Sequence, residues 1–300
     1  MAGIGLIFLR RGGQAHPTAG SDYIRFADEE VLRILMEKGV SSDGVGITKD
    51  DAARVTSIPY TWFRENDKIV SFNEFAYFTG VKAVPETAFR NCTALEEITF
   101  PPSVESIGAN AFYNCTALRY ANIANTYSLD RGSFRNCPLL DLDLSQTTIW
   151  KNTSVGEGIA IASGIIRVNA PMLTDMGTTQ YTTHFYGCLK LEDVLDLGSI
   201  TTIPDGNVNY SVFRGCKNLR KAVLPPTLTH LGAFTFNQCT GLQVLISEAT
   251  TPPTCGTTPF VNTNSTFIIY VPDASVDAYK GAAGWSSFAA SIKGISEYNG

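Results

Sequence analysis

The sequence predicts a repeat solenoid: a right-handed coil with a parallel β-sheet along one face, about eight turns long and capped at both ends. Three observations predict this fold. A motif with one phenylalanine and one cysteine recurs along the chain. Its copies lie 22 to 28 residues apart, with one gap about twice as long. Each repeat also contains a short alternation of apolar and polar residues, which is typical of a strand with one buried face. Self-similarity at such a period indicates stacked coils.

The recurring motif is Phe-x-x-Cys-x-x-Leu, and six of the seven cysteines lie in it, at spacings of 23, 22, 51, 28 and 23 residues. A single coil cannot bury its apolar side chains, but stacking on a neighbour buries them on both faces. We therefore expect these rings and thiols in a shared interior, where removing one ring costs ~3–5 kcal/mol. The pairs are Phe89 and Cys92, Phe112 and Cys115, Phe134 and Cys137, Phe185 and Cys188, Phe213 and Cys216, and Phe236 and Cys239.

The pattern extends beyond the cysteines. Residues 55–63 repeat the apolar spacing of residues 104–112, so Phe63 marks a further coil, with Asn66 in the cysteine position. The gap of 51 residues is close to two periods, so a degenerate coil without its Phe and Cys is expected within residues 149–164. The predicted organisation is an N-terminal helical cap (1–54), repeats (55–248, degenerate at about 149–183) and a C-terminal cap (249–300).

The consensus Val-x-x-Ile-Gly-x-x-Ala-Phe-x-x-Cys-x-x-Leu-x-x-Ile resembles the BspA-like leucine-rich repeats over residues 55–247. The resemblance implies a leucine-rich-repeat solenoid and a role in adhesion or recognition, because the family is described as bacterial surface adhesins and host-protein binders. Residues 270–280 resemble the C-terminal cap of such arrays. The N-terminal part looks like repeat proteins of gut bacteria and of their phages, which implies a phage structural protein as a second setting.

The composition and the N-terminal residues limit the kinds of partner and the locations that we expect for this chain. The net charge is −5 and no Lys/Arg run is present, which argues against a nucleic-acid partner. The apolar run Ile4–Leu9 is short and precedes its arginines, the reverse of a secretory signal, and a membrane span needs ~20 apolar residues. We therefore expect no signal peptide and no membrane insertion. The expected location is a phage virion or the cytoplasm, or the cell surface if another route exports the chain.

No catalytic, cofactor or metal site is expected. The histidines His16, His184 and His230 have no catalytic or metal-binding spacing, and no Cys-x-x-Cys pair is present. We interpret the six repeat cysteines as buried free thiols and Cys255, outside the repeats, as the most reactive one. A cluster of acids near the middle could bind calcium or hydrolyse a sugar, but a water-exposed face explains it better. Its members are Asp141, Asp143, Glu192, Asp193 and Asp196.

The outward strand positions form the candidate binding face, with Tyr120 as its expected anchor because tyrosine is enriched in binding hot spots. We expect these positions to line one continuous exposed sheet. The leading hypothesis is a non-enzymatic module that binds a protein or glycan on a host or bacterial surface, or other phage proteins. The alternatives are a glycan-active enzyme and a purely structural spacer. The face comprises Glu97, Thr99, Tyr120, Asn122, Asp141, Asp143, Lys221 and Val223.

Overall fold

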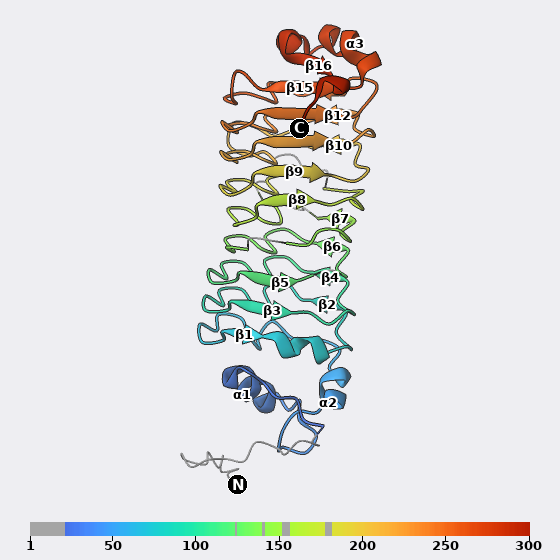
Figure 1. The fold of residues 1–300 in the computed structure, drawn as a ribbon. Coiled ribbons are helices and arrows are strands. Elements are labelled where there is room, and N and C mark those ends of the chain that lie inside the picture. The colour runs from blue at the N-terminus through green and yellow to red at the C-terminus, as the bar shows by residue number, and fades with distance from the viewer. Residues whose placement is uncertain (1–21, 124, 140–141, 152–156, 178–181) are drawn as a thin grey trace.

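A computed structural model describes residues 22–123, 125–139, 142–151, 157–177 and 182–300. The chain forms an elongated solenoid in which successive coils stack along one axis (Figure 1). The strands pair in parallel from coil to coil, so the predicted fold class is confirmed. The solenoid has about nine turns, compared with the eight counted in the sequence.

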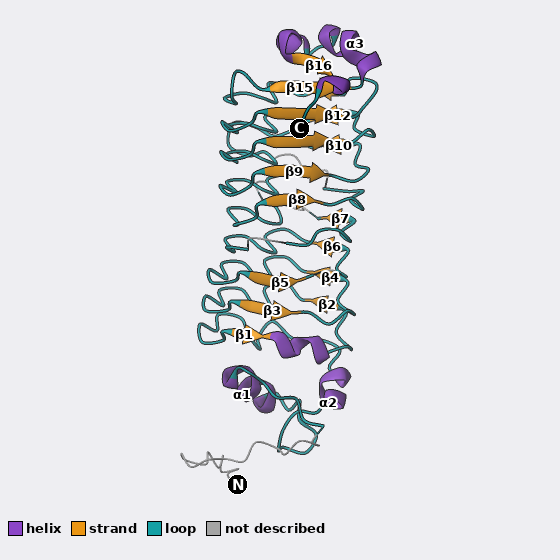
Figure 2. Cartoon of the chain, viewed as in Figure 1, coloured by secondary structure: helices purple, strands orange, loops and turns teal. Residues whose placement is uncertain are grey.

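The strands form two rows along the solenoid, not the single predicted sheet (Figure 2). A bend separates the first strand of a coil from the second, and in some coils it contains two prolines, as Pro101 and Pro102 between Glu97–Thr99 and Ser106–Ile107. The first row contains β1 (Ser71–Phe72), β3 (Glu97–Thr99), β5 (Tyr120–Asn122), β8 (Arg167–Asn169), β9 (Asp193–Asp196), β11 (Lys221–Leu224), β13 (Val244–Ser247), β15 (Ile268–Val271) and β16 (Ile292–Gly294). The second row contains β2 (Ala83–Val84), β4 (Ser106–Ile107), β6 (Ser128–Leu129), β7 (Ile149–Trp150), β10 (Thr202–Ile203), β12 (His230–Leu231) and β14 (Thr254–Cys255).

The first row is also divided into a three-stranded sheet, β1-β3-β5, and a six-stranded sheet that begins at β8. In the coil between them, Leu142 and Leu144 are buried, so the inward alternation persists. Residues 142–144 nevertheless form no strand. The carboxylate of Asp143 instead accepts a hydrogen bond from the Ser145 N–H at 2.9 Å, which is turn geometry. Because residues 140 and 141 lie outside the described residues, the expectation of one continuous sheet stays a prediction at this point.

Phenylalanine rings stack through the interior in two runs. Neighbouring ring centroids lie 5.1 to 5.8 Å apart, with interplanar angles of 5° to 9°. The second run ends at Phe260, which stacks on Phe236 and belongs to a further coil that lacks a cysteine. The first run consists of Phe63, Phe89, Phe112 and Phe134, and the second of Phe185, Phe213, Phe236 and Phe260; all but Phe260, at 4% exposure, are fully buried.

The degenerate coil lies between these runs. Its backbone hydrogen bonds place Ala160 in the ring position and Ser163 in the cysteine position, within the segment expected from the sequence. The indole of Trp150 fills the space that the missing ring leaves, because its centroid lies 5.4 Å from that of Phe185 and it is fully buried. A residue from a different part of the coil thus restores the packing.

All six repeat cysteines are free and buried. Each thiol donates a hydrogen bond to a backbone carbonyl of the preceding coil, at 3.0 or 3.1 Å, as Cys115 does to Phe89. Burial raises the pKa of Cys92, Cys115, Cys188 and Cys216. The thiols therefore behave as small apolar groups with a weak donor.

A backbone position two residues after each ring needs a left-handed conformation. Its φ values lie between 51° and 75° in the coils described. Asparagine and glycine adopt this conformation at the lowest cost, which explains why they recur there. The position is held by Glu65, Asn91, Asn114, Asn136, Ala162, Gly187, Gly215, Gln238 and Asn262.

Helices lie at both ends of the solenoid (Figure 1). At the N-terminal end are α1 (Glu29–Glu37) and α2 (Lys49–Arg54), both within residues 1–54. Asp28 caps α1 through the Glu30 N–H and also accepts the Val70 N–H at 2.7 Å, which ties α1 to the first coil. At the C-terminal end lie α3 (Val276–Gly281) and the 3-10 helices Asp273–Ser275, Ser286–Ser291 and Ile295–Glu297; another 3-10 helix, Asn73–Tyr77, follows β1. The predicted division into caps and repeats stays a prediction.

Candidate binding surface

The outward side chains of β3 and β5 form the first part of the candidate face. Glu97 lies opposite Tyr120 and Thr99 lies opposite Asn122 in the parallel register. Asn73, in the neighbouring 3-10 helix, donates to the Glu97 carboxylate at 2.7 Å and accepts from the Thr99 hydroxyl at 2.8 Å. The Tyr120 side chain is 52% exposed. The structure therefore presents an open tyrosine beside polar groups that are already held in place.

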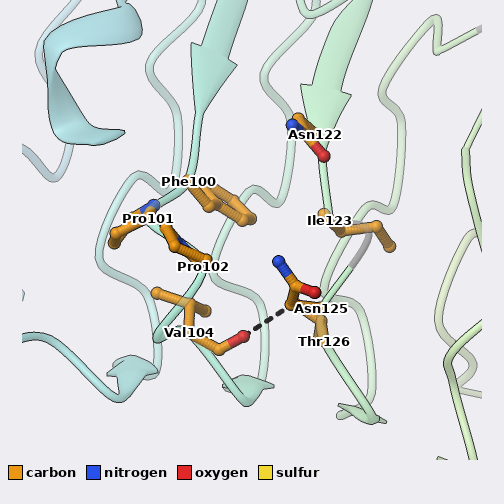
Figure 3. Close-up of a pocket in the computed structure, with 8 residues that line it drawn as sticks. All are labelled: Phe100, Pro101, Pro102, Val104, Asn122, Ile123, Asn125 and Thr126. Atoms are coloured by element: carbon orange, nitrogen blue, oxygen red, sulfur yellow. Dashed lines mark hydrogen bonds between the residues drawn. The ribbon is translucent and has the colours of Figure 1, made fainter. Parts of the chain in front are cut away.

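A small pocket opens beside Asn122, between the coils of β3 and β5 (Figure 3). Its volume is about 120 Å³. The Thr126 hydroxyl donates to the Val104 carbonyl across one side of it, at 3.4 Å. Small-molecule sites usually measure ~300–1,000 Å³, so this pocket can take one small group of a larger partner and no more. It is lined by Phe100, Pro101, Pro102, Val104, Asn122, Ile123, Asn125 and Thr126.

The other predicted face residues lie apart from these four. Lys221 and Val223 lie on β11, in the six-stranded sheet, and both are half-buried. Asp143 is exposed on the turn where the first row is divided, and Asp141 lies outside the described residues. The described residues of the predicted face thus belong to two sheets and to the turn at Asp143.

The mid-chain acids are engaged in structural contacts. Glu192 pairs with Arg220, and Asp193 lies 3.7 Å from the Arg167 guanidinium. Asp196 accepts the N–H of Gly198 at 2.7 Å, as a turn residue does. Among the residues that the structure describes, no cluster of three or more acidic, histidine or cysteine side chains could hold a metal ion. Each described acid thus has a role that requires no bound metal or substrate.

The described histidines and Cys255, the cysteine outside the repeats, also lie in environments that a structural role explains. The fully buried His184 ring hydrogen-bonds the Met176 carbonyl at 2.6 Å, and burial lowers its pKa to about 4. His230 lies between Asp205 and Thr254, at 3.1 and 3.0 Å, while His16 lies outside the described residues. Cys255 is half-buried, and burial raises its pKa to about 12, so little reactive thiolate forms at neutral pH.

One surface feature has no counterpart in the predicted sites. The residue after each ring forms a row in which Arg90 and Arg135 lie on either side of the Tyr113 ring, 5.3 and 5.5 Å from its centroid. Arg214 lies over Tyr186 in the same way, at 5.0 Å. Aromatic–cation stacking of this kind stabilises neighbouring coils. The signal in the sequence is the alternation of Arg and Tyr after successive phenylalanines.

No described helix is long and apolar enough to span a membrane.

The family model for the BspA type leucine-rich repeat region matches six copies over residues 56–192 and 178–276. No curated protein matches.

Similar solved structures include a leucine-rich repeat protein from Bacteroides ovatus, with 23% identity, a TM-score of 0.49 and coverage of 65% of this chain and 48% of the other. A leucine-rich repeat protein from T. pallidum has 16% identity, a TM-score of 0.27 and coverage of 71% and 78%. A leucine-rich cell surface protein from Faecalibacterium prausnitzii has 15% identity, a TM-score of 0.29 and coverage of 73% and 72%. The chain spans about half the length of the Bacteroides ovatus protein. Because the family model matches most of its length, the chain belongs to the BspA-type leucine-rich repeat family.

Proposed function

We propose that the chain is a non-enzymatic recognition module that binds a protein or a glycan through the outward face of the first strand row. The observation that carries this proposal is Tyr120, 52% exposed on a strand whose neighbour is held by hydrogen bonds. An open aromatic ring on a rigid sheet loses little conformational entropy on binding. Leucine-rich repeat proteins are generally binding modules, which supports the same class of function.

The test is retention of the purified chain on intact gut-bacterial cells and on immobilised host matrix proteins. Tyr120→Ala should reduce retention at least about tenfold, as expected for a hot-spot residue. Tyr127→Ala is a matched control, because Tyr127 is 43% exposed just before β6 of the second strand row, close to Tyr120 in sequence. If no surface retains the wild-type chain, or if both variants bind equally well, the outward face of the first row is not the binding surface.

We further propose that the module works on a bacterial surface or as a component of a phage virion. The two settings differ in what the chain assembles with. A surface adhesin is recovered from cells without phage proteins, whereas a virion component co-sediments with assembled phage particles. Immunodetection in gradient-purified particles and in cell-envelope fractions separates the two settings. Absence from both fractions would contradict both.

A further inference from the structure

The last residues of the chain turn back across the outward face of the six-stranded sheet. After β16, Ser296 donates through its N–H and its hydroxyl to Asp273, at 3.2 and 2.8 Å, which fixes the direction of the turn. The end of the chain then lies over the strands next to β15 (Figure 1). We call residues 295–300 the strap. It covers the Lys221 side chain of β11 in the first row.

Tyr298 is the strap residue that contacts the sheet. Its ring centroid lies 5.0 Å from that of Tyr270 on β15, and the Lys221 Nζ on β11 lies 5.3 Å from its centroid. Because β13 lies between β11 and β15, the ring sits over β13. There Ile246 is in register with Val223 and Tyr270 on the outward side, yet it is only 8% exposed. We call the site that Tyr298 occupies its seat. The seat combines the apolar side chain of Ile246, the aromatic ring of Tyr270 and the cationic amine of Lys221.

These three features select an aromatic side chain. An aliphatic group gains nothing from the cation, and an anionic or amide group is poorly placed against the apolar floor. An aromatic ring buries its face on Ile246 while interacting with Lys221 and Tyr270. In the uncovered three-stranded sheet, Tyr120 occupies the same outward position as Lys221 and stays open. The strap thus lies over an outward position that the three-stranded sheet leaves open.

We propose that the seat of Tyr298 is an aromatic subsite of the binding surface, that the strap occupies it in the free chain, and that a partner protein displaces the strap by inserting an aromatic side chain of its own. This inference rests on the proposed function. A short tethered segment competes at an effective concentration in the millimolar range. The strap therefore weakens the apparent affinity of the partner by a factor equal to one over the fraction of chains in which the seat is free, so a partner must also make contacts outside the seat to bind tightly.

The first experiment tests occupancy of the subsite and needs no partner. The full-length wild type, Tyr298→Ala and Tyr298→Phe are acylated briefly with an amine reagent, and the modified lysines are quantified by mass spectrometry. Lys221 should react several-fold faster in Tyr298→Ala and at the wild-type rate in Tyr298→Phe, which keeps the ring. Lys217, exposed on the same coil, is the internal control. Equal Lys221 rates in the wild type and Tyr298→Ala would overturn the proposal.

The second experiment tests the chemistry of the occupant. The labelled peptide Ser-Glu-Tyr-Asn-Gly has the sequence of residues 296–300. It is titrated into the wild type and into Tyr298→Ala at up to millimolar concentration, and binding is detected by NMR. It should bind Tyr298→Ala and bind the wild type about tenfold more weakly, since the strap competes there. A peptide with alanine in place of tyrosine should not bind. Absence of binding to Tyr298→Ala, or equal binding of both peptides, overturns the aromatic subsite. Retention on cells that is lost in Tyr120→Ala would still support the proposed function.

Discussion

His184 makes the stability of the solenoid depend on pH. The folded chain buries this ring completely in its neutral form, with one nitrogen bonded to the Met176 carbonyl and the other accepting the Ile159 N–H at 3.4 Å. Burial lowers its pKa from 6.5 to about 4. Below pH 6.5 the unfolded chain gains a proton that the folded chain does not take up, so the stabilisation is complete above that pH and is lost as the pH falls toward 4.

The magnitude follows from the difference between the two pKa values. A shift from 6.5 to about 4 corresponds in full to roughly 3.4 kcal/mol. At about pH 5 most of the unfolded chain is protonated and most of the folded chain is not, so the expected loss relative to neutral pH is about 2 kcal/mol. That is a large part of the stability of a typical domain.

The assay is urea unfolding followed by circular dichroism at about pH 7.5 and pH 5. The comparison is with His184→Gln, which keeps a donor and an acceptor but does not titrate. Its free energy of unfolding should fall by about 2 kcal/mol less than that of the wild type between the two pH values. The half-buried His230 is present in both chains and so does not contribute to this difference. If both chains lose the same free energy, His184 is not held neutral in the folded state.

Three further predictions concern the interior. Phe112→Ala should cost ~3–5 kcal/mol in thermal or urea unfolding, whereas Tyr60→Ala, on an exposed ring, should cost less than about 0.5 kcal/mol; similar values would contradict the ring stack. A thiol reagent should label no repeat cysteine in the native chain. It should label Cys255 slowly, and faster as the pH rises toward the Cys255 pKa of about 12. Rapid labelling of several thiols would refute the burial of the repeat cysteines. Asn114→Gly should be more stable than Asn114→Ala by ~1 kcal/mol, because the φ at this position is 61°; the reverse order in urea unfolding would exclude a left-handed requirement.

Most of the fold could be predicted because each coil repeats one environment. A ring at Phe89 and a ring at Phe112 meet the same neighbours one coil apart, so the same residue type recurs and the period becomes visible. The open position of Tyr120 follows from strand alternation alone. The coil of Phe260 was missed because no cysteine follows that ring, although Asn262 repeats the asparagine of the earlier coils. Trp150 was missed because it fills the interior from outside the motif.

The candidate face could be predicted only in part. Alternation identifies which strand residues point outward, but not whether adjacent strands join. The turn at Asp143 depends on a side-chain hydrogen bond that no periodicity marks. The covering of Lys221 by Tyr298 joins residues far apart in the sequence, and neither one carries a local signal of the contact.

The period, the residues of the interior, the parallel stacking and the outward position of Tyr120 could all be derived from the amino-acid sequence. These features depend on contacts between neighbouring coils, and a regular contact of that kind leaves a regular pattern in the chain. The second row of strands, the neutral burial of His184 and the seat of Tyr298 become visible only in the folded chain. Each of these features depends on contacts that occur once in the molecule, so no repeated spacing in the sequence marks them.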